Sequence, residues 1–397
     1  MLQRVERHII MQSETLEELT YLSKNLYNYA NYQIRQHFFN TGKMLNEFDL
    51  TLKLARENQD DYRAMPTAQS AQQTIKLLFK NWKSFFKSIE GYKLNPKKYL
   101  GRPKLPKYLK KDGHNILIFT NQNCKLKNGY IYFPKKSKIE PLKTKITSKI
   151  KQVRVIPQAS CFIVEVVFEK DIQKVNLVDD TYLSIDLGLN NLVTTFNNIG
   201  EKPFIINGKI IKSINQYYNK KKAKLMSYIG DRGVSNRINR LTHKRECKIN
   251  DYLHKSSREI VNYCIKHKIS TIIIGDNKNW KQNINIGKRN NQSFVSVPFS
   301  KLIQMISYKS EEVGIKVKTT EESYTSKIDH LANEKMKKQE RYLGKRKKRG
   351  LFISSINKFL NADVNGAIGI MRKVVPEVVL GTLRDRGTVF VPYKTII

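Results

Sequence analysis

The chain has 397 residues, of which 40% are apolar and 10% aromatic, and its 73 lysines and arginines against 34 acidic residues give a formal net charge of +39. No apolar stretch reaches the roughly 18 to 20 residues of a membrane span, and the first residues lead into no secretory apolar core, so we expect a soluble, non-exported protein without a membrane partner. Charge repulsion of this size destabilises a compact state unless a polyanion neutralises it, and a phosphate backbone does so while releasing counterions. Nucleic acid is therefore the expected partner.

The four cysteines are Cys124, Cys161, Cys247 and Cys264. None has a partner at the two-to-four-residue spacing of a zinc ribbon. They are interpreted as small apolar residues of a reducing compartment.

Two amphipathic helices are predicted in the first quarter of the chain, over residues 16–39 and 68–89, where apolar residues recur at helical spacing. The second helix carries glutamines and lysines away from its apolar side. These side chains fit two interpretations, contact with a duplex groove or an ordinary solvated helix face. The candidate nucleic-acid contacts on this helix are Gln72, Gln73, Lys76 and Lys80.

Between these helices and residue 180 the sequence is strand-like and rich in turns. The run GRPKLPK at 101–107 is interpreted as an extended basic connector, because each proline disfavours helix for the residue before it. Its Arg102 and Lys104 are further candidate nucleic-acid contacts. Short strands are predicted at residues 4–11, 116–119, 130–133, 152–156 and 161–169. They are expected to close a small β-barrel that the helical segment interrupts.

After residue 180 the pattern becomes that of a mixed α/β domain. Strands are predicted at 182–187, 192–196, 203–206, 271–274 and 315–320, and helices across 214–268 and 299–312. Three antiparallel strands followed by alternating strands and helices is the ribonuclease H order. Lys220 and Lys221 in the long basic helical stretch are candidate RNA contacts. The predicted fold class is α+β and multidomain, a small β-barrel with a helical insertion followed by an RNase H-like mixed α/β domain.

Asp186 is a single carboxylate in the otherwise apolar run YLSIDLGL at 182–189. It is either a helix or turn cap in a segment wrongly interpreted as a strand, or a metal ligand on a rigid element beside a polyanionic substrate. The carboxyl ends of parallel strands in an open α/β sheet face one crevice, where ligands bind. The strand at 315–320 runs into Glu321 and Glu322 at that edge. Asp363 begins a late predicted helix, where a carboxylate is also common as an answer to the helix dipole.

Several segments taken together resemble the TnpB proteins, transposon-encoded relatives of the type V CRISPR effectors. The GRPKLP connector resembles that family's Gly-x-Pro-x-x-Pro segment, and HKSS at 254–257 its His-bearing helix. The resemblance covers essentially the whole chain. The three segments that resemble the family signatures are SIDLGLN at 184–190, SYTSK at 323–327 and DVNGA at 363–367.

The resemblance implies a β-barrel wedge domain at 1–14 and 91–178, a helical recognition insertion at 15–90, and a RuvC-like nuclease domain at 179–397. The implied activity is RNA-guided cleavage of double-stranded DNA next to a short transposon-adjacent motif. The implied setting is cytoplasmic and nucleoid-associated in a prokaryote, with the protein a monomer on its guide RNA.

The chain also departs from the family pattern. The strand before the second signature ends at Gly275 where most members have a catalytic glutamate, and Asp276 cannot replace it because successive strand residues point to opposite faces. A subset of TnpB proteins and the related Fanzor proteins use a glutamate just before the Tyr-Thr-Ser segment, which here is Glu322, preferred to Glu321. The family's zinc ribbon is also absent. Its place holds His330 and the basic run at 345–349, interpreted as a solvated or phosphate-contacting loop.

The leading hypothesis is a two-metal phosphodiesterase with Asp186, Glu322 and Asp363 as catalytic residues and ligands of two Mg²⁺ ions, for which Mn²⁺ would substitute. Carboxylates without cysteines suit such hard cations. Sequence choice would come from base pairing with a guide RNA. The alternative, motivated by Gly275, is a nuclease-inactive RNA-guided DNA-binding repressor, and a third hypothesis is a conventional transposase that joins DNA ends without RNA.

Overall fold

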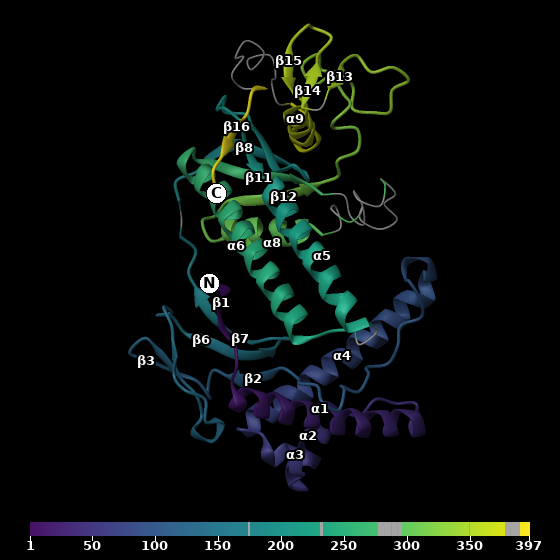
Figure 1. Ribbon diagram of the computed structural model, residues 1–397, viewed down its shortest axis with the longest axis vertical. Helices are drawn as coiled ribbons and strands as arrows, with labels where there is room; N and C mark the ends of the chain where they lie inside the picture. The colour runs from purple at the N-terminus through teal and green to yellow at the C-terminus, as the bar shows by residue number, and fades with distance from the viewer. Residues whose placement is uncertain are drawn as a thin grey trace. The chain divides into compact units, whose positions relative to one another are not determined.

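The computed structural model describes residues 1–173, 175–230, 233–276, 287, 292, 296–348, 350–377 and 390–397, and it divides into two compact units, Met1–Asp171 and Ile172–Ile397 (Figure 1). The first unit has one continuous apolar core, and the second has two. Among these residues, no helix combines the length and the apolar character that crossing a membrane requires.

The first unit contains the two predicted amphipathic helices, α1 (Glu14–Thr41) and α4 (Ala68–Leu94). Ser13 and Thr67 cap their N-termini, each accepting a hydrogen bond from a backbone N–H of the first turn. The helices pack together through apolar side chains and through Trp82, whose indole N–H donates to Asn31 Oδ1 over 3.0 Å. The sequence did not predict the short helices that lie between and after them, α2 (Glu47–Arg56), α3 (Asp60–Ala64) and η1 (Pro96–Lys98).

The strands expected to form a barrel lie in two antiparallel sheets of the first unit. The larger sheet has the order β1-β7-β6-β2 and the smaller one β3-β4-β5. In the described residues β1 and β2 are the edges of the larger sheet, so backbone hydrogen bonding does not close it into a barrel. The strands are β1 (Leu2–Ile10), β2 (Leu117–Thr120), β3 (Lys125–Lys127), β4 (Tyr130–Tyr132), β5 (Leu142–Lys143), β6 (Ile150–Pro157) and β7 (Phe162–Lys170), with a 3-10 turn η2 (Lys135–Ser137).

The basic connector is extended, as its prolines predict, and lies against α1. Asn31 Nδ2 and Arg35 donate to the carbonyl of Pro106 over 3.2 and 2.9 Å. Asn28 bonds both the N–H and the C=O of Leu109. These polar side chains satisfy backbone groups of a segment that has no strand partner.

The second unit is built on one six-stranded sheet of order β12-β11-β8-β9-β10-β16. Strands β8, β9 and β10 are antiparallel neighbours, while β11 and β12 run parallel to β8. This confirms the predicted RNase H order, to which the structure adds β16 at the far edge. The strands are β8 (Val178–Leu187), β9 (Asn191–Asn197), β10 (Phe204–Asn207), β11 (Ile269–Gly275), β12 (Lys316–Thr320) and β16 (Tyr393–Thr395).

Helices cover both faces of this sheet (Figure 1). On one face α6 (Asn236–Lys266) and α8 (Phe299–Glu311) share a core with Ile185 and Ile274, and α9 (Ala362–Val374) packs on the other face against Ile273. The basic stretch predicted as one helix is two, α5 (Lys209–Ile229) and α6. Gly230 directly follows α5 and Gly233 precedes α6, and both have a positive φ, of 53° and 78°, which glycine adopts without strain.

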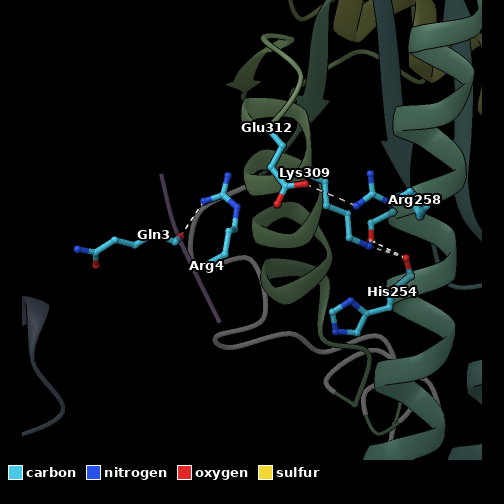
Figure 2. Close-up of polar contacts among 7 residues, drawn as sticks. Gln3, Arg4, His254, Arg258, Lys309 and Glu312 are labelled. Atoms are coloured by element: carbon cyan, nitrogen blue, oxygen red, sulfur yellow. Dashed lines mark hydrogen bonds and ion pairs between the residues drawn. The ribbon is translucent and has the colours of Figure 1, made fainter. Parts of the chain in front are cut away.

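A buried lysine joins α8 to α6 (Figure 2). Lys309 is 4% exposed, and its ammonium donates to the carbonyl of His254 over 2.6 Å and to Ser257 Oγ over 2.7 Å. Arg258 pairs with the carboxylate of Glu312 over 3.7 Å beside it. Burial, with the help of Arg258 and against Glu312, lowers the pKa of Lys309 from 10.5 to about 8.

A small sheet lies between the second and third signature segments, where the sequence predicted a loop. Most of the basic run at 345–349 forms an exposed strand rather than a loop, and Arg349 lies outside the described residues. The run pairs with a strand whose Phe352 is buried. The described side chains of the basic run are all exposed, so the run lacks the apolar–polar alternation by which a strand is predicted from sequence. The strands are β13 (Lys345–Lys348), β14 (Leu351–Ile353) and β15 (Phe359–Asn361).

Candidate active site

Asp186 lies near the end of the central strand β8, on the sheet face that α9 covers. Side chains alternate along a strand, so Ile185 and Leu187 enter the core on one face while Ser184 and Asp186 point to the other. Ser184 Oγ donates to the carbonyl of Ala367 in α9 over 2.7 Å. The helix approaches so closely that a Cβ at Gly366 would lie 2.7 Å from Asp186 Oδ2. Glycine at 366 therefore allows α9 to lie directly over the Asp186 carboxylate.

Asp363 occupies the first turn of α9. The Asn361 side chain caps the helix by accepting from the N–H groups of Asp363 and Val364, which orients the first turn. The Asp363 carboxylate accepts from Asn191 Nδ2 over 2.7 Å and pairs with Arg346 over 3.2 Å. Asp363 is thus a helix-terminal acid, as the cap interpretation requires, and it also faces groups from β9 and β13.

Glu322 follows β12 and turns toward the end of β11. Strands β11 and β12 are parallel neighbours in which Gly275 pairs with Thr320. A Cβ built on Gly275 would lie 2.7 Å from Glu322 Cγ and closer still to its Oε1. The side chain of Glu322 therefore occupies the space into which a residue at 275 would project.

Glu321 has a different environment. It is exposed and accepts a 2.5 Å hydrogen bond from Ser323 Oγ, whereas Oε1 of Glu322 is buried. The next turn holds Glu322 in place, because the N–H and Oγ1 of Thr325 both donate to its carbonyl. Tyr324 in this turn has φ of 66°, an uncommon conformation for a bulky residue that typically marks a functional site.

The electrostatics connect the three acids. Burial, reinforced by the carboxylates of Glu322 and Asp363 and opposed by Arg346, raises the pKa of Asp186 well above its ordinary value. Burial, reinforced by Asp276 and opposed by Lys373, raises the pKa of Glu322 to about 7. Carboxylates that perturb one another in this way are typical of sites that bind a cation or transfer protons.

The donor chemistry of this group fits a hard divalent cation, because all three side chains offer carboxylate oxygens and a cation between them would relieve their mutual repulsion. In the part of the chain that the structure describes, no group of three or more histidine, cysteine, aspartate or glutamate side chains is arranged tightly enough to hold a metal ion. Side-chain rotation at Glu322 and Asp363 would have to accompany binding.

The other candidate residues lie away from these acids in the chain. Gln72, Lys76 and Lys80 are exposed on α4, where Gln73 is half-buried. Arg102 and Lys104 are exposed on the connector, and Lys220 and Lys221 are exposed on α5. Their contact with nucleic acid stays a prediction.

Two residues at the candidate site were missed in the sequence. Asn191 ends the turn after the first signature segment, and its role as a donor to Asp363 depends on α9 folding over that turn. Arg346 belongs to the basic run, where only its position in β13 distinguishes it from its neighbours. No sequence signal marks either contact, because both join elements more than fifteen residues apart.

The chain matches two known family models. Residues 166–281 match the model OrfB_IS605, described as probable transposase, and residues 299–370 match the Cas12f1-like TNB domain. Glu322, Arg346 and Asp363 lie in the second match, and Asp186 lies in the first.

One curated relative and one solved structure are similar over most of their length. The TnpB-like protein ORF457 of the Acidianus two-tailed virus is 24% identical over 415 residues, which cover 93% of this chain and 85% of the relative. A cryo-EM structure of a Cas12f1–sgRNA–target DNA complex aligns with 90% of this chain and 83% of that chain, at 16% sequence identity and a TM-score of 0.58. The fold is therefore that of the Cas12f1 protein, and the chain is similar in sequence to a TnpB-like protein, which confirms the resemblance seen in its signature segments.

Proposed function

We propose that the protein is an RNA-guided DNA endonuclease of a transposable element, which cuts guide-matched DNA next to a short flanking motif. The observation that carries this proposal is the position of Glu322, whose side chain fills the space in front of Gly275. An acid is thereby supplied at the end of β11 although the strand itself ends in glycine. This supports membership of the subset of TnpB proteins with a relocated glutamate.

In this proposal Asp186, Glu322 and Asp363 hold two Mg²⁺ ions, which would supply Lewis acid chemistry for phosphodiester hydrolysis when bound. Asp186 would be the ligand shared by both ions, because it lies on β8 in the middle of the sheet. Asn191 orients one oxygen of Asp363. Arg346 neutralises the other in the absence of a cation, and it is exposed enough to turn toward a phosphate.

Guide RNA and double-stranded DNA are the proposed partners. The net charge of +39 supports a polyanionic partner. The Cas12f1 structure of similar fold contains an sgRNA and a target DNA. A guide would supply sequence recognition by base pairing, so that the protein needs to recognise only backbone shape and the flanking motif.

The test begins with the RNA that co-purifies with the protein. Sequencing should find one structured RNA with a variable end, and a plasmid that carries the matching sequence should be cut in Mg²⁺. Asp186→Ala should abolish cutting while leaving RNA content and plasmid binding unchanged. Magnesium-dependent cutting that survives Asp186→Ala would overturn the proposed site.

The same experiment separates the other two hypotheses. Guide-dependent binding without cutting in Mg²⁺ or Mn²⁺ would indicate the nuclease-inactive repressor. Strand joining that proceeds without co-purified RNA would indicate a conventional transposase.

A further inference from the structure

Helix α5 presents an exposed stripe in which two lysines lie between two tyrosines. Tyr217, Lys221, Lys224 and Tyr228 are separated by intervals of four, three and four residues, which places them on one face of a helix. Tyr217 is 61% exposed and Tyr228 is 70% exposed, and both lysines are exposed. The Lys221 ammonium lies 5.8 Å from the centre of the Tyr217 ring. We call these four residues the α5 stripe.

The opposite face of α5 shows that the stripe has no packing role. Ile211 and Asn215 are buried there, and Arg245 of α6 donates to Asn215 Oδ1 over 2.7 Å. Tyr218 is held in the same interface by its hydroxyl contact with Thr242 and by the Arg245 guanidinium over its ring. The tyrosine that stabilises the helix pair is therefore Tyr218, whereas Tyr217 and Tyr228 expose most of their surface to solvent.

Helix α6 also has an exposed basic face, but that face carries charge alone. Arg237, Arg240, Lys244 and Lys248 share one face at helical spacing and are all exposed. Every residue of α6 is described, and no large apolar or aromatic side chain of this helix is exposed. A charged face suits the regular phosphate spacing of a duplex, whereas rings beside charges suit bases that are free to stack.

The N-terminal end of α5 lies beside the candidate active site. Gly208, which precedes the helix, donates its N–H to the carbonyl of Asn190 over 2.8 Å, and a Cβ on it would collide with backbone atoms of Leu189. Lys212 in the first turn donates to Asn190 Oδ1 over 3.0 Å. The next residue, Asn191, bonds the Asp363 carboxylate. One short turn thus connects the start of α5 to the acids.

We propose that the α5 stripe binds single-stranded DNA, with bases stacked on Tyr217 and Tyr228 and phosphates on Lys221 and Lys224. This inference rests on the proposed function, because pairing of a guide with one DNA strand leaves the other strand without a partner. The two rings are eleven residues apart, about 16 Å along the helix, which corresponds to roughly five nucleotides at a stacked spacing of ~3.4 Å. The stripe would hold the displaced strand toward the C-terminal end of α5, the helix whose N-terminal end leads to the acids.

The test measures binding of a fluorescein-labelled 20-nucleotide oligo(dT) and of a 20-base-pair duplex to the protein with its co-purified RNA, in EDTA. The double variant Tyr217→Ala/Tyr228→Ala should bind oligo(dT) at least tenfold more weakly, because each stacked base contributes roughly 1–3 kcal/mol. Duplex binding should change less than twofold. Tyr217→Phe/Tyr228→Phe keeps both rings and should bind oligo(dT) as the wild type does.

Two matched controls locate the effect. Tyr32→Ala removes a tyrosine of α1 that is 49% exposed, and it should leave oligo(dT) binding unchanged. Lys244→Gln/Lys248→Gln removes two charges from α6 and should weaken duplex and single-strand binding to a similar degree. Lys221→Gln/Lys224→Gln should lower the slope of log affinity for oligo(dT) against log salt by about 1.4, which is about 0.7 for each phosphate contact.

Three outcomes would overturn the proposal. Equal losses for oligo(dT) and duplex in the tyrosine double variant would identify a general backbone-binding face. A loss of co-purified RNA in that variant would assign the stripe to the guide RNA. Unchanged oligo(dT) affinity would remove any role in DNA binding. Since binding in EDTA needs no cutting, repeating it with Asp186→Ala separates failure of the stripe from failure of the proposed nuclease.

Discussion

Two groups of acids in the second unit have opposite environments, one fully buried and one half-buried. Asp329 is completely buried, and its carboxylate accepts hydrogen bonds from Ser354 Oγ, from the N–H and Oγ of Ser355 and from the N–H of Ala332. Glu334 nearby accepts from the N–H groups of Asp329 and Leu343. These acids cap loops around the small sheet β13-β14-β15.

The acids at the candidate active site are arranged differently. Asp186 has Glu322 and Asp363 close enough to raise its pKa, and Glu322 is in turn affected by Asp276. Donors surround the carboxylate of Asp329, whereas Asp186 lies beside two other carboxylates, and a proton or a cation would relieve their repulsion. The comparison separates an acid that is hydrogen-bonded within the fold from acids whose arrangement suits the proposed cation site.

The largest effect is expected from Asp186→Asn. Guide-directed plasmid cleavage in Mg²⁺ should fall by roughly 10³-fold or more, because the shared ligand is lost at the centre of the site. The thermal unfolding temperature in EDTA should be no lower than that of the wild type and is expected to rise, since a neutral amide replaces a carboxyl group whose charged form two neighbouring carboxylates repel. A clear drop in thermal stability would show that Asp186 is a structural acid like Asp329.

Glu322 provides the second test, with its neighbour as a matched control. Glu322→Gln should reduce cleavage by roughly 10²-fold or more, while Glu321→Gln should stay within about threefold of the wild type, because only Glu322 has its side chain at the end of β11. Similar losses in the two variants would contradict the assignment.

A swap of position sharpens the same point. Glu322→Ala clears the space in front of Gly275, so Gly275→Glu in that background returns an acid to the end of β11, where it must displace the flexible end of Ile370. The double variant should cleave at least tenfold faster than Glu322→Ala. Gly275→Glu alone should not be active, because its side chain would collide with Glu322.

Asp329→Ala should give the reverse of the Asp186 result. Removing the carboxylate leaves several buried donors without an acceptor, which should destabilise the second unit by about 2–3 kcal/mol and lower its unfolding temperature by roughly 5–10 °C. At a temperature where the variant is folded, cleavage should stay within a few-fold of the wild type. Unchanged thermal stability would show that the hydrogen bonds to Asp329 contribute nothing net.

The two groups of acids also differ in how well the sequence predicted them. Apolar periodicity in the sequence was enough to predict the strand order of the second unit. The start of the predicted helix at Asp363 was enough to place that acid in the first turn of α9. Glu322 could be proposed from the resemblance to the TnpB subset with a relocated glutamate, and the strand that runs into it allowed that assignment. Its approach to Gly275 could not be derived from the residues alone, since it depends on the register of β11 and β12.

The structural acids gave no local signal. Asp329 is bonded to serines 25 and 26 residues later, and the two strands between them, β13 and β14, are only four and three residues long. Short polar strands are fixed by tertiary contacts rather than by their own pattern. Tyr217 and Tyr228 were also missed, although they lie in a segment that was predicted as a helix. A helical pattern alone does not distinguish an exposed ring from one packed against a neighbouring helix.

The smallest effect is expected at Lys309, where the question is whether hydrogen bonds alone keep a buried side chain charged. Lys309 has hydrogen-bond partners, as Asp329 has, but burial and Arg258 lower its pKa to about 8. The unfolded chain, with a lysine pKa near 10.5, binds more protons than the folded chain between these values, so this residue makes stability rise with pH across that window. Lys309→Met does not titrate. Its stability relative to wild type, from urea unfolding, should therefore fall by about 1–2 kcal/mol between pH 7.5 and 9.5. A flat difference for Lys309→Met would mean that the hydrogen bonds to α6 hold the ammonium charged throughout.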